Sequence, residues 1–372
     1  MIFRTKFLIL MTAFLFAMID GYKCDTLSCL PEECHALDPE ALCEGGNYTT
    51  IPDFDSCGFH LTELAFSGSV ISSLTDNSIP SGLTQLTFDE TIIYHISDGA
   101  FNKVAGTLSY LAFNSALSGK IPDAFLKLNA LRSLELNAIQ MTDWNIPVIQ
   151  KLGLTLTYLG TTNVGLVTWP SWFTYFKALT ELRFSTTKFT DIPENAFVNT
   201  TATLTSLELS YGNLTRIPKE IFYLKSLTEL YLYVNQITVI ENLPHEVTTL
   251  DLNGNYIEEI YSDSFHVASK LEDVTLNNNP ITRIASDAFV STPNLKYLHL
   301  IGTKLTRMPL AVSSLRQLAK LEFGEDKTLI CTCLEASLGD WILSLPSLSI
   351  SGECNSIDIR EFFTKLASQC PV

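Results

Sequence analysis

Apolar residues recur at one spacing through most of this chain, and the clearest stretch is Leu227–Ile284. Three successive copies read LTELYLYVNQITVI, VTTLDLNGNYIEEI and LEDVTLNNNPITRI, with Val247 and Val274 in place of leucine. Residues two apart, such as Leu230 and Leu232, point to the same face of a strand. The pattern therefore predicts a short strand in each copy, with one buried face and one exposed face.

An asparagine follows each predicted strand at the same place, as Asn235, Asn255 and Asn279. At a turn out of a strand, backbone N–H and C=O groups lose their ladder partners. An amide side chain offers both donors and an acceptor, so stacked asparagines can form a structural ladder that satisfies these groups. This combination of apolar spacing and asparagine resembles the leucine-rich repeat.

The same frame extends over most of the chain and predicts about twelve repeats. A single repeat cannot bury its apolar face alone, so the whole stack is the folding unit. The resemblance implies an α/β solenoid, a horseshoe with a parallel β-sheet on its concave face and an irregular or short-helical convex side. The predicted repeat starts are Leu61, Leu83, Leu108, Leu131, Leu156, Leu179, Leu204, Leu227, Val247, Leu271, Leu295 and Leu318.

Outside the three central copies, the asparagine position holds other residues. Serine or threonine can partly replace an amide, but Ala116, Ile139 and Val164 offer no hydrogen-bonding side chain there. The repeats that begin from Leu108 to Leu156 are therefore expected to turn differently or to use water. They should form the least regular part of the solenoid.

The N-terminus has the features of a secretory signal peptide. Arg4 and Lys6 precede the apolar run Phe7–Ile19, and cleavage is expected near Gly21. The alternative is a membrane anchor, for which this run is short. No other run predicts a membrane span, so we expect a secreted, extracellular protein. The expected organisation is a signal peptide at 1–21, an N-terminal cap at 22–60, repeats at 61–328 and a C-terminal cap at 329–372.

The nine cysteines lie only near the two ends of the chain. In an oxidising compartment such clusters indicate disulfides, and a solenoid needs its end faces covered. The clusters resemble the cysteine-rich caps of extracellular leucine-rich repeat proteins. At the C-terminus that resemblance implies the pairs Cys331–Cys354 and Cys333–Cys370. A zinc site is the alternative interpretation of these cysteines.

The N-terminal cap departs from the family pattern, in which the central cysteines read C-x-C. Here Cys24, Cys29, Cys34 and Cys43 are candidates for disulfides within the cap, and Cys57 follows as a fifth cysteine. An odd number leaves one thiol over, which could be free or could link a disulfide-bonded dimer. The pairs and the odd cysteine stay open at this point.

The residues between the inward leucines should line the concave face, the usual ligand surface of a solenoid. Acidic residues outnumber basic ones there, and the whole chain has a formal net charge of −16. Such a field disfavours nucleic acid and favours basic partners. Exposed tyrosines are good contact residues, although they could also simply cover the sheet. The candidate partner-binding residues are Glu229, Tyr231, Tyr233, Asp251, Asp273, Tyr297 and His299.

Two further features concern single side chains. Arg183 should pair laterally with Glu208 in the next repeat, which is a structural role. Asn47, Asn199 and Asn213 each begin an N-x-[ST] sequon and are predicted glycosylation sites in a secreted protein.

The chain lacks the motifs H-E-x-x-H, G-x-S-x-G and a Gly-rich phosphate loop, so we expect no enzyme activity, metal or cofactor. The first hypothesis is a secreted protein that recognises a protein ligand through its acidic, tyrosine-containing concave face. The alternative is a non-catalytic accessory or scaffold subunit of a secreted enzyme complex. The layout is similar to the non-catalytic leucine-rich repeat subunit of decapod shrimp luciferase, which implies a separate catalytic partner subunit.

Overall fold

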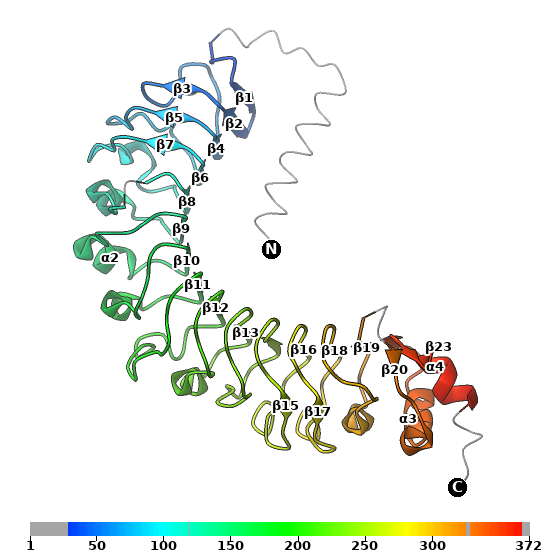
Figure 1. Cartoon of the computed structure of the whole chain (residues 1–372). Helices are drawn as coiled ribbons and strands as arrows, with labels where there is room; N and C mark the ends of the chain where they lie inside the picture. The colour runs from blue at the N-terminus through cyan, green and yellow to red at the C-terminus, as the bar shows by residue number, and fades with distance from the viewer. Residues whose placement is uncertain (1–28, 118, 325–327, 367–372) are drawn as a thin grey trace.

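The computed structural model describes residues 29–117, 119–324 and 328–366. They form one curved solenoid, with a long sheet lining its concave side (Figure 1). The predicted signal peptide at 1–21, Cys24 and Cys370 lie outside the described residues. In the part of the chain that is described, no helix has the length and apolar character needed to cross a bilayer.

The main sheet has 15 strands that follow one another in chain order. β1 pairs antiparallel with β2, and each later neighbouring pair is parallel. A strand begins two residues after each of the twelve predicted repeat starts. The strands are β1 (Cys34–Leu37), β2 (Glu40–Glu44), β4 (Glu63–Ser67), β6 (Gln85–Asp89), β8 (Tyr110–Asn114), β9 (Ser133–Asn137), β10 (Tyr158–Thr162), β11 (Glu181–Ser185), β12 (Ser206–Ser210), β13 (Glu229–Tyr231), β14 (Thr249–Asp251), β16 (Asp273–Thr275), β18 (Tyr297–His299), β19 (Lys320–Glu322) and β21 (Ser349–Ser351).

The register of the sheet stacks apolar side chains from repeat to repeat. Leu230 pairs with Leu250, and Leu250 pairs with Val274. All three side chains are buried, which confirms the predicted inward row. In the N-terminal half, Phe88 stacks between two other phenylalanines, with ring centroids 5.6 Å from Phe66 and 5.1 Å from Phe113. One continuous core therefore runs along the arch.

Short helices and small sheets form the rest of the solenoid, as expected for its convex side. Pro122, Pro170, Pro218 and Pro309 each directly precede a five-residue 3-10 helix. Because proline fixes φ and lacks an N–H, it suits this start of a helical turn. The helices are η1 (Asn102–Val104), η2 (Asp123–Lys127), α2 (Ile146–Leu152), η3 (Ser171–Tyr175), η4 (Lys219–Tyr223), η5 (Leu310–Ser314), η6 (Cys333–Glu335), α3 (Leu338–Ser344), α4 (Ile359–Glu361) and the π-helix η7 (Phe362–Leu366). The small sheets are β3 (Asn47–Tyr48), β5 (Val70–Ile71) and β7 (Ile92–Ile93); β15 (Glu259–Ile260) and β17 (Arg283–Ile284); and β20 (Thr328–Leu329), β22 (Glu353–Cys354) and β23 (Ile357–Asp358).

One turn geometry recurs in every described repeat. The residue just before the asparagine position has a positive φ, the left-handed conformation that favours glycine. Glycine occupies the position in only some repeats, so elsewhere an L-residue accepts the cost of that conformation. The residues are Gly68, Glu90, Ser115, Ala138, Asn163, Thr186, Tyr211, Val234, Gly254, Asn278 and Gly302.

The expectation of a different turn in the repeats from Leu108 to Leu156 was therefore wrong. Ser115 has a φ of 58° and Ala138 a φ of 54°, the same region as in the asparagine-containing repeats. The strands there span five residues, so the ladder between strands continues up to the turn. The N–H of Ser115, for example, donates to the carbonyl of Asn137 in the next repeat at 2.7 Å. The side chain of Ile139 is then free to extend the buried core.

In the asparagine-containing repeats the strands span only three residues, and the amides complete the bonding. Nδ2 of Asn255 donates to the carbonyls of Leu232 and Leu252, both at 3.0 Å. Its Oδ1 accepts from the N–H of Ile237 at 3.0 Å. Asn235 and Asn279 make equivalent contacts in their own repeats. Each side chain thus links two repeats through buried backbone groups.

Disulfides hold the N-terminal cap. Cys34 bonds to Cys43 across the β1–β2 hairpin, and Cys29 bonds to Cys57. The sequence-based list of paired cysteines omitted Cys57, and the structure corrects it, because folding brings Cys57 back against the start of the cap. The odd N-terminal cysteine is thus none of these four, and Cys24 lies outside the described residues.

The C-terminal cap contains the bond between Cys331 and Cys354 that the family resemblance implies. Cys333 is also disulfide-bonded, and its implied partner, Cys370, lies outside the described residues. The cap is attached to the last repeat through Trp341 in α3, whose Nε1 donates to the carbonyl of Leu315 at 2.9 Å.

We expect Asn255→Ala to lower the free energy of unfolding by about 1–3 kcal/mol, because the change leaves buried backbone groups without partners. Urea unfolding of the variant and the wild type measures the loss. Asn102→Ala, at an exposed position in η1, is the matched control and should be nearly neutral. Equal stability of the Asn255 variant and the wild type would contradict a role for the amide ladder.

Candidate functional site

The sheet register places the candidate partner-binding residues in rows along the concave side. Tyr231 pairs with Asp251, and His299 continues that row through Thr275. Glu229, Asp273 and Tyr297 belong to the neighbouring row, and Tyr233 lies just beyond β13. We use the term central concave face for Glu208, Glu229, Tyr231, Tyr233, Asp251, Asp273, Tyr297 and His299.

The tyrosines of the central concave face are oriented by carboxylates. The hydroxyl of Tyr233 donates to Oε1 of Glu208 at 2.5 Å, and that of Tyr231 donates to Oε2 of Glu229 at 3.3 Å. Burial, with a smaller effect of these carboxylates, raises the pKa of each tyrosine to about 12. Both hydroxyls therefore remain protonated donors at neutral pH.

Sequence reasoning missed Tyr211, which belongs beside these residues. Its ring meets that of Tyr233 edge to face, with centroids 5.4 Å apart, and it is 52% exposed. Tyr211 occupies the left-handed position of its repeat, with a φ of 50°. A bulky aromatic residue at the place where other repeats carry glycine was the signal in the sequence that could have identified it.

Asp251 lies in a half-buried, negatively charged part of the face. Burial raises the pKa of its carboxyl, and repulsion from Asp273 and Glu208 raises it further. The N–H of Asn253 donates to Oδ1 of Asp251 at 2.8 Å and opposes this rise in pKa. Charge of one sign is therefore concentrated on neighbouring strands, and a cationic group placed there would be favoured.

His299 connects three strands. Its Nδ1 lies 2.5 Å from Oε2 of Glu322, and its Nε2 lies 3.5 Å from Oδ1 of Asp273. The Asp273 contact, followed by that with Glu322, raises the pKa of His299 against the opposing effect of burial. Lys320 in turn holds Glu322 at 2.6 Å. Because both ring nitrogens face carboxylates of this chain, His299 braces the sheet laterally as well as lying on the candidate surface.

A second polar cluster on the concave side was only partly predicted. The expected lateral pair is present, with Nε of Arg183 3.3 Å from Oε1 of Glu208. Beside it, the hydroxyl of Tyr158 donates to Oε1 of Glu135 at 3.0 Å. Gly160 makes room for this contact, because a Cβ there would approach the Tyr158 hydroxyl to 2.5 Å. Burial raises the pKa of the Glu135 carboxyl, and the Tyr158 hydrogen bond opposes that rise. Tyr158 and Glu135 satisfy each other, whereas Nε of Arg183 makes an ion pair with Glu208 but no hydrogen bond within the described part of the chain.

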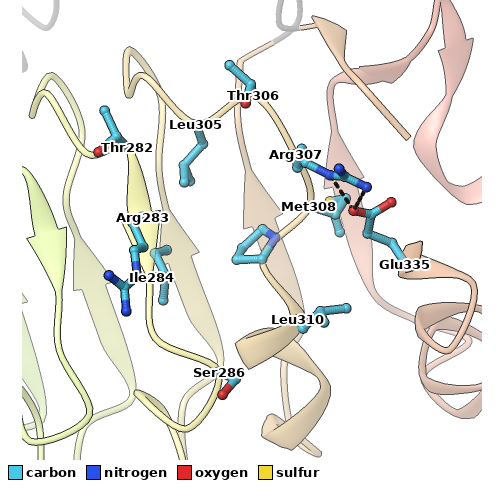
Figure 2. Close-up of a pocket in the computed structure, with 11 residues that line it drawn as sticks. Thr282, Arg283, Ile284, Ser286, Leu305, Thr306, Arg307, Met308, Leu310 and Glu335 are labelled. Atoms are coloured by element: carbon cyan, nitrogen blue, oxygen red, sulfur yellow. Dashed lines mark hydrogen bonds and ion pairs between the residues drawn. The ribbon is translucent and has the colours of Figure 1, made fainter. Parts of the chain in front are cut away.

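An open pocket lies where the last repeats meet the C-terminal cap (Figure 2). Its lining includes Thr282, Arg283, Thr306, Leu310 and the ion pair of Arg307 with Glu335. Nε of Arg307 donates to Oε1 of Glu335 at 2.5 Å, and Nη2 donates to Thr332 Oγ1 at 2.7 Å. The guanidinium is thus used to attach the cap. Among the described residues, no group of three or more His, Cys, Asp or Glu side chains could hold a metal ion.

Comparison with family models finds leucine-rich repeats between residues 170 and 323. A model described as Leucine rich repeat matches residues 245–305 and 269–323. A model described as BspA type Leucine rich repeat region (6 copies) matches residues 170–244. No curated protein gives a significant match to the chain.

Solved structures share the fold at low sequence identity. A chain of the Toll–Spatzle complex of Drosophila matches with a TM-score of 0.63 and 18% identity, over 79% of this chain and 48% of that chain. A leucine-rich repeat protein of Leptospira interrogans matches with a TM-score of 0.65 and 22% identity, over 82% and 75%. A chain of the TLR13–ssRNA13 complex matches with a TM-score of 0.59 and 20% identity, over 79% and 50%. This chain thus spans about half the length of the first and third of these chains.

The raised pKa of His299 predicts a pH-dependent contribution to stability. Protonation is favoured in the folded state, so the contribution is complete below the ordinary pKa of 6.5 and is lost as pH rises through the folded-state pKa. The gap in Tm between the wild type and His299→Gln should therefore shrink from about pH 6 to about pH 8. His95→Gln, an exposed histidine, is the control. A gap that is constant or grows with pH contradicts the prediction.

Proposed function

We propose that this leucine-rich repeat protein, with its disulfide-bonded caps, binds a protein partner through the central concave face. The partner would present basic side chains to the carboxylates and apolar surface to the tyrosine rings. Disulfides at both ends and the fold similarity to a Toll-complex chain suggest an extracellular-facing protein. Binding outside the cell is therefore part of the proposal.

The main support for this proposal is the distribution of charge over the main-sheet strands β12, β13, β14, β16 and β18. The described concave positions of these strands hold four carboxylates and neither lysine nor arginine. Arg183 on β11 pairs with Glu208, and His299 faces Asp273. Asp251 has no such ion pair among the described residues, and repulsion from Asp273 and Glu208 raises its pKa. The positions are Ser206, Glu208, Ser210, Glu229, Tyr231, Tyr233, Thr249, Asp251, Asn253, Asp273, Thr275, Asn277, Tyr297 and His299.

This acidic surface disfavours nucleic acid and favours a basic protein surface. Uncompensated carboxylates repel the phosphates of nucleic acid, whereas exposed tyrosines supply rigid contact area at low entropic cost. The rings of Tyr211 and Tyr233, with the nearby carboxylates, form a mixed apolar and acidic patch. This mixture suits a basic protein surface. The accessory-subunit role remains a prediction, since no curated protein matches the chain.

The test is affinity capture of extracellular proteins from the source tissue, with the mature chain as bait. A partner retained by the wild type should bind the variant Tyr231→Ala with Asp251→Asn more weakly by about tenfold or more, the scale of an interface hot spot. Its retention by the wild type should also fall as salt is raised. Tyr223→Ala is the control, because it removes a ring that is 63% exposed on η4. It should change neither the affinity for the partner nor the salt dependence of binding.

Unchanged affinity of the double variant for the same partner would place the contact elsewhere on the molecule. Binding that is insensitive to salt would rule out the electrostatic part of the proposal.

A further inference from the structure

An open groove lies beside β15. Figure 1 shows β15 on the flank of the solenoid, outside the main sheet. The lining of the groove includes Thr215, Gln236, Val239, Tyr256, Glu258 and Tyr261. None of these residues belongs to the central concave face. One end of the groove adjoins the sequon Asn213-Leu214-Thr215.

Backbone hydrogen bonds place three consecutive repeats side by side along this groove. The N–H of Gln236 donates to the carbonyl of Leu214 at 2.8 Å, and that of Tyr256 donates to the carbonyl of Ile237 at 2.9 Å. Asn213, Gln236 and Tyr256 each follow the asparagine position of their repeat. Strand-like neighbours lie roughly 4.8 Å apart, so Tyr256 is about 10 Å along the flank from Asn213.

The side chain of Asn213 is oriented by a hydrogen bond to Gln236, which lines the groove. Its Oδ1 accepts from Nε2 of Gln236 at 3.3 Å, which links the carboxamide to the next repeat along the groove. Within the sequon, Asn213 is half-buried, Leu214 is buried and Thr215 is exposed. The sequons at Asn213 and Asn199 differ in which amide atom is bonded. At Asn199 it is the nitrogen, because Nδ2 donates to the carbonyl of Thr174 at 2.6 Å.

The groove combines apolar rings with hydrogen-bonding groups. Tyr256 is 59% exposed and Tyr261 is 46% exposed, and Val239 and Gln236 line the same groove. Sugars match this mixture, because the C–H face of a pyranose can cover an aromatic ring while its hydroxyl and acetamido groups bond to amides and carboxylates. A glycan attached at the neighbouring sequon could therefore cover the exposed apolar area of the groove.

We propose that Asn213 carries an N-linked glycan whose two-sugar N-acetylglucosamine core lies in this groove against Tyr256. In the modification, Nδ2 of Asn213 forms a bond to C1 of the first sugar of a lipid-diphosphate-linked oligosaccharide. The C1–O bond to the diphosphate breaks, Nδ2 loses one proton, and the lipid diphosphate leaves. The glycan covers this flank and leaves the central concave face open. The proposal is independent of partner binding at that face.

The experiment uses the full chain secreted by a glycosylating eukaryotic cell line. Glycopeptide mass spectrometry first establishes whether Asn213 is modified. Folded wild type and Asn213→Gln are then treated with tetranitromethane, and nitration is measured at each tyrosine. We expect Tyr256 to be protected in the wild type and to lose that protection in the variant. Tyr223 should react equally in both proteins, since its exposed ring lies on η4, away from the groove.

If Asn213→Gln is not secreted, removal of the glycan from the folded wild type by peptide N-glycosidase provides the same comparison. An unmodified Asn213 overturns the proposal. A modified Asn213 with equal nitration of Tyr256 before and after glycan removal shows a glycan that extends into solvent, and this also overturns it.

Discussion

A single repeat leaves both sides of its leucine row uncovered until a neighbour in the same register packs against each side. The pairing of Leu230 with Leu250, and of Leu250 with Val274, meets this need in the centre of the arch. The register can continue only if each repeat leaves its strand at the same point. A left-handed residue therefore marks that point throughout the described repeats, even at Val234, where a β-branched side chain makes the conformation unfavourable.

The chain satisfies the backbone at this turn in two ways. In the centre, amides such as that of Asn255 bond to carbonyls of two repeats, and the strands are short. In the N-terminal half, five-residue strands carry the ladder further, and apolar residues such as Ile139 occupy the asparagine position. The second arrangement adds buried apolar surface where the first adds buried hydrogen bonds. Both keep the same strand register, and the sheet therefore passes without interruption from one to the other.

The same register determines how charge is distributed on the concave side. Neighbouring strands bring together residues of adjacent rows, so Asp251 on β14 and Asp273 on β16 repel each other although they are distant in sequence. Where a basic residue is adjacent, as Arg183 is to Glu208, the charges cancel within the chain. Where none is adjacent, negative charge remains for a partner. The flank beside Asn213 has a different composition, rich in exposed rings, and is suited to a different kind of covering group.

The spacing of leucines by itself determined the solenoid, the buried row and the positions that face the concave side, because the direction of a side chain in a strand is a local property. Cysteines confined to the ends likewise predicted disulfide-bonded caps. Only the tertiary structure decided which residues meet across repeats, such as Cys29 with Cys57 and His299 with Asp273 and Glu322. The repeat frame aligns residues of equivalent position, such as Arg183 and Glu208, but it specifies neither the path of the chain in the caps nor the direction in which a side chain such as His299 turns.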